Sequence, residues 1–108
     1  MPVLIIETSV FTRLITALMS DEEYAGLQAA LVKKPDQGDL IPGSGGLRKV
    51  RWKLPGKGKR GGVRIIYYWM RADEQLWMLY AYAKSQQEDL TPAQLATLRA
   101  IVERWKDE

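Results

Sequence analysis

Cysteine and histidine are both absent from this sequence of 108 residues. Without cysteine there is no disulfide framework, which is typical of proteins that work in a reducing cytosol. Without histidine, catalysis by a pair of imidazoles acting as base and acid is excluded. No cluster of cysteine and histidine can hold zinc either.

Long hydrophobic runs are also missing. The stretch IIYYWM, in the middle of the chain, is far too short to span a bilayer. The opening residues, MPVLIIETSVF, lack the basic leader of a signal peptide. We therefore expect a cytoplasmic protein with no membrane association, folded as one domain over residues 1–108.

Acidic residues are missing from one long segment. No aspartate or glutamate occurs from Leu40 to Ala72, although nine lysines and arginines do. The rest of the chain carries seven cations and all 13 acids, a net charge of −6, so the overall charge of +3 hides a strong asymmetry. Charge divided in this way favours a polyanionic partner that meets one segment. The alternative is a solvated surface without a partner, but such a surface normally mixes both signs.

Capping signals and apolar spacing predict the elements. Ser20 with Glu23, and Thr91 with Gln94, each match a capping box, and Pro92 suits the first position of a helix. Apolar residues recur at helical spacing after each cap and also from Ser9 onward. The glycine-rich segment DQGDLIPGSGG reads as a connector. The predicted strands are Val3–Ile6, Leu47–Leu54, Gly62–Met70 and Gln75–Ala83.

The resulting order, βααβββα, predicts an α+β fold in which helices cover one face of an antiparallel sheet. Strand alternation assigns Trp77 and Leu79 to the covered face and Met78 to the open one. Ile66 and Met70 are apolar members of the open face, which the last helix or a protein partner would cover. The open face is expected to carry Lys49, Arg51, Lys53, Arg64, Tyr68, Tyr80, Tyr82 and Lys84.

Cations interleaved with aromatic rings on an open sheet suit single-stranded RNA, because the cations meet phosphates and the rings stack on bases. The basic segment has no carboxylate to hold Mg²⁺, and its glycine-rich loop GKGKRGG lacks the lysine-serine or lysine-threonine pair of a Walker loop. Lysine, arginine and tyrosine remain. They can cleave RNA without metal or cofactor if the ribose 2′-hydroxyl attacks the phosphate, with proton transfer by a lysine or tyrosine of shifted pKa. Basic faces bind nucleic acid more often than they cut it.

Several motifs in order carry a family resemblance. The chain reads SDEEYAGLQ, GGLRKVRW, GKGKRGG, GGVRIIYYW, LYAYAKSQQEDL and DLTPAQ, and this series resembles the RelE/ParE toxin superfamily, within it the HigB-like toxins. The resemblance covers nearly the whole chain. It implies a βααβββα toxin of a type II toxin–antitoxin system that cleaves messenger RNA in the ribosomal A site. It also implies a cognate antitoxin, often with a helix-turn-helix DNA-binding domain.

The resemblance also implies roles for four cations. Lys49 and Arg51 match the two strand cations of RelE-type toxins, Arg64 matches the arginine that contacts phosphate, and Lys84 matches the cation that ends the last strand. RelE has a further arginine and a tyrosine just after that strand.

At the corresponding places this chain reads Ser85 and, approximately, Thr91. The candidates for proton transfer are therefore Tyr68, Tyr82 and Lys84, although Tyr82 could equally be a cross-strand packing partner. Further cations are expected to add affinity for RNA or the ribosome: Arg48, Lys53, Lys57, Lys59 and Arg60. Four of the acids outside the basic segment are most simply solvated loop residues or the start of a cap: Asp36, Asp39, Glu88 and Asp89.

Two rival functions stay open. The superfamily also contains gyrase poisons, which need no RNA-cutting residues, although Lys49, Arg51, Arg64 and Lys84 argue against that class. The same face could also serve a non-catalytic module that binds RNA or the ribosome.

Overall fold

The computed structural model describes residues 3–54 and 62–107. Three of the strands begin and end close to their predicted bounds, and both predicted capping boxes are present at Ser20 and Thr91. The helix that begins at Ser9 also has an N-cap: the Thr8 side-chain oxygen accepts a hydrogen bond from the Phe11 backbone N–H. The elements are β1 Leu4–Glu7, α1 Ser9–Leu18, α2 Asp21–Lys33, β2 Asp39–Leu40, β3 Leu47–Lys53, β4 Gly62–Met70, β5 Gln75–Ala83 and α3 Pro92–Lys106.

The strands form one five-stranded sheet in the order β1-β5-β4-β3-β2. The prediction of an antiparallel sheet is wrong at one edge: β1 runs parallel to β5, while the other pairs are antiparallel, so the sheet is mixed. The predicted connector contains β2, in which Asp39 lies opposite Lys49 and Leu40 opposite Arg48. These two residues cover part of the outer edge of β3, where backbone groups would otherwise lack partners.

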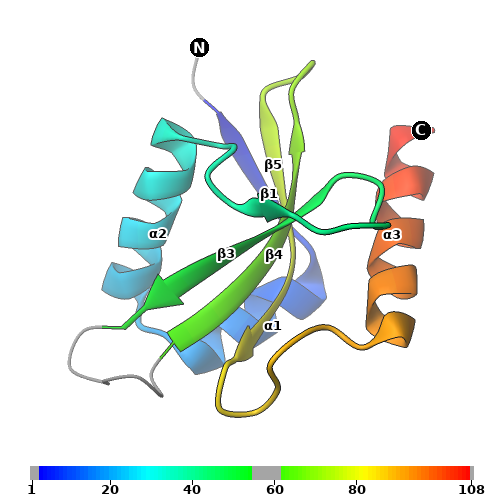
Figure 1. The fold of residues 1–108 in the computed structure, drawn as a ribbon. Coiled ribbons are helices and arrows are strands. Elements are labelled where there is room, and N and C mark those ends of the chain that lie inside the picture. Colours follow the sequence, from blue (N-terminus) through cyan, green and yellow to red (C-terminus); the bar gives the residue numbers. More distant parts are fainter. Residues whose placement is uncertain (1–2, 55–61, 108) are drawn as a thin grey trace.

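Helices lie on both faces of the sheet, with α1 and α2 on one face and α3 on the other (Figure 1). The α+β class is confirmed, but the placement of all helices on one face is wrong. The physical reason is that both faces of the sheet carry large apolar side chains. Phe11 and Leu27 pack on the first face, while Leu98 and Val102 of α3 bury Ile66 on the second.

An extra residue in β5 changes which face its side chains reach. Ile66 pairs with Tyr80 but Tyr67 pairs with Met78, so the register between β4 and β5 shifts at this point. The alternation of side chains reverses across such a bulge. Trp77 and Leu79 therefore pack in the cluster under α3, and Met78 packs under α1 and α2, the reverse of the prediction.

Within the described residues, no helix has both the length and the apolar character needed to cross a membrane.

Candidate functional site

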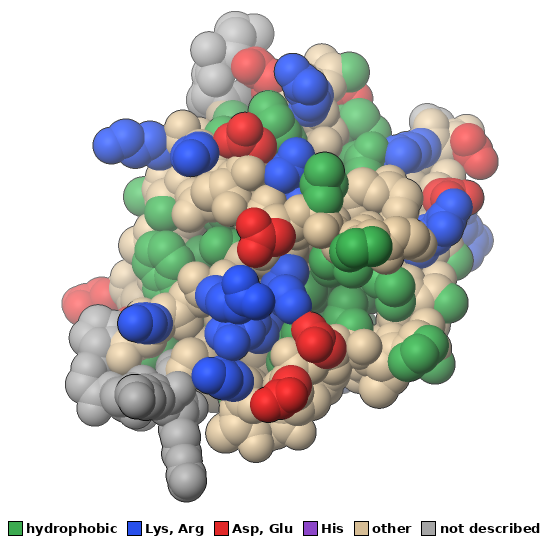
Figure 2. Space-filling view, in the orientation of Figure 1, with side chains coloured by type: hydrophobic (Ala, Val, Ile, Leu, Met, Phe, Trp, Pro, Cys, Tyr) green, Lys and Arg blue, Asp and Glu red, His purple; other side chains and the backbone are tan. Residues whose placement is uncertain are grey.

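Four of the predicted cations converge on the α3 face of the sheet. Arg51 of β3 lies opposite Arg64 of β4, which in turn lies opposite Tyr82 of β5. Lys49, Arg51, Arg64 and Lys84 line one hollow of about 210 Å³, which we call the basic hollow. Figure 2 shows blue side chains gathered over the sheet, with acidic side chains at the margin of the patch. The hollow therefore concentrates positive charge and can attract an anion.

Two acids, expected to be solvated loop residues or the start of a cap, complete the wall of the basic hollow: Glu88 and Asp89. Lys49 donates to the Asp89 carboxylate across 2.7 Å. The Lys49 side chain is only 18% exposed and that of Asp89 is 74% exposed, so the acid reaches the lysine from the solvent side. This hydrogen bond and the charge of Lys49 lower the pKa of Asp89 below its ordinary value.

A second acid, Asp39, pairs with the cation cluster more loosely, through Arg51. Arg51 and Asp39 lie 3.5 Å apart, and both side chains are mostly exposed. A pair of this kind contributes little to stability, because water and salt screen it. Arg51 thus stays available to an incoming phosphate.

A smaller hollow of about 190 Å³, which we call the side hollow, adjoins the basic one and shares Lys49 and Asp89 with it. Tyr82 lines it and is only 3% exposed. The Tyr82 hydroxyl has no hydrogen-bond partner among the described residues. Burial raises the pKa of Tyr82, the charge of Asp89 adds to the increase, and Arg64 and Arg51 oppose it. Tyr82 therefore keeps its proton at neutral pH and can donate a hydrogen bond. The other residues of the side hollow are apolar: Ile41, Leu90 and Leu95.

The segment that carries Asp89 is held by the cap of α3. Gln87 Nε2 donates to the Asp89 carbonyl, 2.8 Å, and to Gln94 Oε1, 3.0 Å. Gln94 in turn accepts from the Thr91 backbone N–H and donates to the Tyr80 hydroxyl. A local sequence signal, the capping box, thus positions an acid beside a lysine 40 residues away in the chain.

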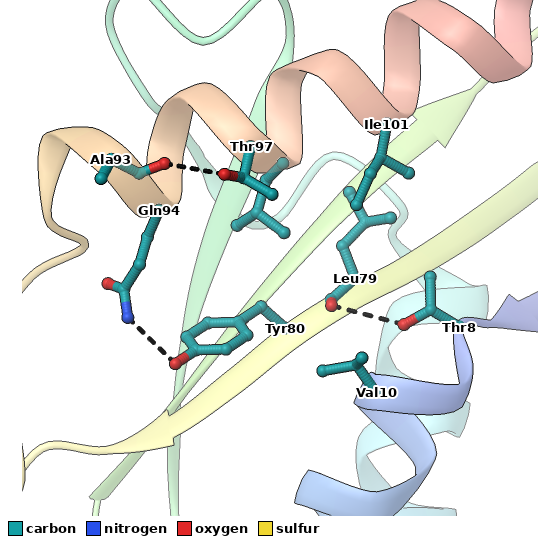
Figure 3. A pocket seen from close by; sticks show the side chains of 9 residues that line it. Thr8, Val10, Leu79, Tyr80, Ala93, Gln94, Thr97 and Ile101 are labelled. Carbon is teal, nitrogen blue, oxygen red and sulfur yellow. Dashed lines mark hydrogen bonds between the residues drawn. The ribbon is translucent and has the colours of Figure 1, made fainter.

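A larger groove of about 330 Å³ lies between α3, β5 and the start of α1, and Tyr80 is one of the residues that line it. Figure 3 shows Val10 and Ile101 facing it, the hydrogen bond from Gln94 to Tyr80, and that from Thr8 to the Leu79 carbonyl. Among the residues that the structure describes, no lysine, arginine, aspartate or glutamate lines this groove. It is chemically distinct from the two hollows.

The structure does not bring Tyr68 to the basic hollow. Its ring packs on Trp77, with centroids 5.3 Å apart, and the Lys106 ammonium lies 4.8 Å from its centroid. It lies four residues along β4 from Arg64, roughly 13 Å at the spacing of a strand. Tyr68 therefore belongs to the packing beneath α3.

Arg48 also lies apart from the cluster. Its guanidinium donates to the carbonyls of Asp36 and Gly38, at 3.1 and 2.8 Å, and so ties the segment before β2 to β3. Lys53 is exposed at the end of β3, on the same face as Lys49 and Arg51. Three other predicted binding residues lie outside the described residues: Lys57, Lys59 and Arg60.

In the described parts of the chain, no group of three or more histidine, cysteine, aspartate or glutamate residues is arranged to hold a metal ion. The sequence carries one signal for the acids of this site. Asp39 directly precedes the acid-free segment, and Asp89 follows the last residue of β5 by six positions, so a turn can return each of them to the cations.

Comparisons with known proteins agree with this fold. A solved structure of the E. coli toxin RelE, an arginine double mutant in the free state, matches with a TM-score of 0.56 and 11% identity. The match covers 94% of this chain and 98% of that chain, and at this identity it shows the fold. The family model described as the RelE toxin of the RelE/RelB toxin–antitoxin system matches residues 5–107. The superfamily resemblance is thus confirmed, whereas the HigB-like branch stays a prediction. The chain belongs to the RelE toxin family of toxin–antitoxin systems.

Proposed function

We propose that this toxin inhibits translation by cutting messenger RNA on the ribosome, as a cytoplasmic endoribonuclease restrained by a cognate antitoxin. The observation that carries the proposal is the convergence of Lys49, Arg51, Arg64 and Lys84 around one hollow. Four cations in one concave site match a phosphate whose negative charge grows during the reaction. Membership of the RelE toxin family supports a toxin role and an antitoxin partner.

The proposed reaction uses the substrate's own nucleophile. The ribose 2′-oxygen forms a bond to the adjacent phosphorus, and the bond from phosphorus to the 5′-oxygen of the next nucleotide breaks. The products are a 2′,3′-cyclic phosphate and a free 5′-hydroxyl. One proton leaves the 2′-hydroxyl and one arrives at the 5′-oxygen, so the protein has to move protons and stabilise charge. No metal or cofactor takes part in this scheme.

Each of the four cations of the basic hollow has a part in the proposal. Arg64, in the middle of the sheet between Arg51 and Tyr82, holds two phosphate oxygens through parallel N–H donors. Lys49 and Arg51 add positive charge on one side. Lys84, which follows the last residue of β5, donates a proton to the leaving 5′-oxygen, and the proton of the 2′-hydroxyl passes to water. Tyr82 keeps its proton and donates a hydrogen bond, and Tyr68 has no part because it packs under α3.

Purified ribosomes with a defined message provide the test. We expect the chain to produce cuts within the codon in the A site, with 5′-hydroxyl ends that can be mapped by primer extension. Messages that stay intact while the toxin remains ribosome-bound would indicate a binding module without catalysis.

Expression without the antitoxin separates the remaining rival. We expect translation to stop while DNA damage stays low. Induction of the SOS response, with messages intact, would instead indicate a gyrase poison.

A further inference from the structure

The side hollow has the composition of a small ligand site. Ile41, Leu90 and Leu95 supply apolar walls, and three polar groups lie among them. Its volume of about 190 Å³ is enough for a planar ring but not for a folded peptide. Sites of this kind combine an apolar surface with a few polar groups that select one orientation.

The Tyr82 hydroxyl points to a ligand because it is buried and lacks a partner within the described structure. Buried polar atoms almost always have a hydrogen-bond partner, and an exception at a hollow calls for a group that supplies one. The neighbouring tyrosine shows the contrast. Tyr80, whose ring centroid is 6.0 Å from that of Tyr82, has its hydroxyl bound to Gln94 (Figure 3).

The ion pair of Lys49 and Asp89 forms the wall between the two hollows, since both residues line both of them. A phosphate in the basic hollow offers Lys49 a second anion. Asp89 is mostly exposed, so its carboxylate can turn from Lys49 with little cost in packing. When the pair opens, one oxygen acceptor from Asp89 and one donor from Tyr82 face the same space.

We propose that the side hollow binds the nucleobase of the nucleotide whose phosphate occupies the basic hollow, and that it selects adenine and cytosine over uracil. In both selected bases a ring nitrogen that accepts a hydrogen bond lies beside an amino group that donates. Tyr82 donates to the ring nitrogen, and the Asp89 carboxylate accepts from the amino group. Uracil has a ring N–H and a carbonyl at these places, so its carbonyl would face the carboxylate.

This inference rests on the proposed function, and mononucleotides test it separately. Cytidine 3′-monophosphate and uridine 3′-monophosphate have the same size and charge and differ only at this edge of the base. Titration of the full chain, followed by NMR or calorimetry, should show that the cytidine nucleotide binds about tenfold more tightly, the scale of a hydrogen bond to a charged group. Inorganic phosphate is titrated in parallel, because it reports on the basic hollow alone.

Three variants sharpen the result. Asp89→Asn should abolish the preference, because an amide can donate to uracil as readily as it accepts from cytosine. Tyr82→Phe should weaken binding of the cytidine nucleotide by about fivefold. Tyr80→Phe is the matched control, because it removes a neighbouring hydroxyl that already has a partner, and it should keep the preference.

Each outcome decides a different question. Equal binding of the two nucleotides, with phosphate still bound, overturns the nucleobase site and leaves the proposed function standing. Equal effects of Tyr82→Phe and Tyr80→Phe, or none from either, show that the Tyr82 hydroxyl only meets water. Failure of the chain to bind even phosphate removes the basis of the proposed function itself.

Discussion

The two faces of the sheet differ in how completely helices cover them. On the α1 and α2 face, buried apolar side chains run from Leu54 and Val63 at one end to Tyr67 and Leu76 at the other. On the opposite face, α3 packs over the part of the sheet that carries Trp77 and Leu79, and the basic hollow lies beyond it. The comparison shows how a small chain accommodates like charges, because a closed apolar face supports the strands from which the cations project.

The first prediction concerns the closed face. Phe11 is fully buried beneath the sheet, whereas Val10, its neighbour in α1, is 42% exposed. Phe11→Ala should lower the free energy of unfolding by about 3–5 kcal/mol, through lost burial and the cavity left behind. Val10→Ala, the control, should change it by about 0.5 kcal/mol or less. Urea unfolding followed by circular dichroism measures both changes. If Phe11→Ala lowered the unfolding free energy as little as Val10→Ala, the core would not depend on this face.

The second prediction concerns the open end of the other face. Arg64→Lys keeps the charge but removes the paired N–H donors, so ribosome binding should persist while cleavage falls by roughly 10²-fold or more. Lys53→Ala removes an exposed cation outside the basic hollow and should weaken binding slightly without changing the single-turnover rate. If both variants lost activity only through weaker binding, Arg64 would be one more phosphate contact.

The third prediction returns to the closed face and its polar anchor. The Tyr67 hydroxyl donates to the Pro35 carbonyl, 2.7 Å, and accepts from the Gly38 backbone N–H, 2.9 Å. Tyr67→Phe leaves these groups without their partner and should cost about 1–3 kcal/mol of unfolding free energy. Thermal unfolding measures the loss. Tyr80→Phe is the control on the other face, because the Tyr80 hydroxyl has one hydrogen bond, from Gln94. If Tyr80→Phe lowered the unfolding free energy more than Tyr67→Phe, the closed face would not be the more firmly anchored of the two.

The fourth prediction measures how many cations meet phosphates. About four contacts from the basic hollow should give a slope near −3 for log affinity against log salt with single-stranded RNA, at about −0.7 per contact. Arg51→Ala should make the slope shallower by about 0.7, because its side chain is exposed and only loosely paired with Asp39. Filter binding over a range of salt measures the slope. A value near zero would show that RNA binds elsewhere.

The smallest expected effect is a pH dependence of the folding stability at acidic pH. The pKa of folded Asp89 lies below its ordinary value of 3.8, because Lys49 stabilises the carboxylate. The contribution of Asp89 to stability is therefore present above pH 3.8 and is lost as the pH falls through its lowered pKa. Because the group is exposed, the loss should be small. Acid unfolding curves of the unaltered chain and of Asp89→Asn should differ in steepness only in that acidic range.

Local signals allowed much of the fold to be predicted. The capping boxes at Ser20 and Thr91 involve residues three apart, so the sequence predicts them, and the structure confirms both. The predicted ranges of β4 and β5 match the observed ones. The alternation in β3 and β4 also placed Lys49, Arg51 and Arg64 on one face, where the basic hollow lies.

The sequence by itself determined which segments become helices and strands and which segment holds the positive charge, because these properties depend on neighbours along the chain. Only the tertiary structure decided that α3 covers the second face and that Asp89 pairs with Lys49. It also decided that a bulge in β5 turns Trp77 toward α3 and Met78 toward α1 and α2. Both sides of β5 are apolar at the bulge, so either alternation fits the sequence equally well. The contact of Asp89 with Lys49 joins residues 40 apart, and only the packing of α3 against the sheet brings them within hydrogen-bonding distance.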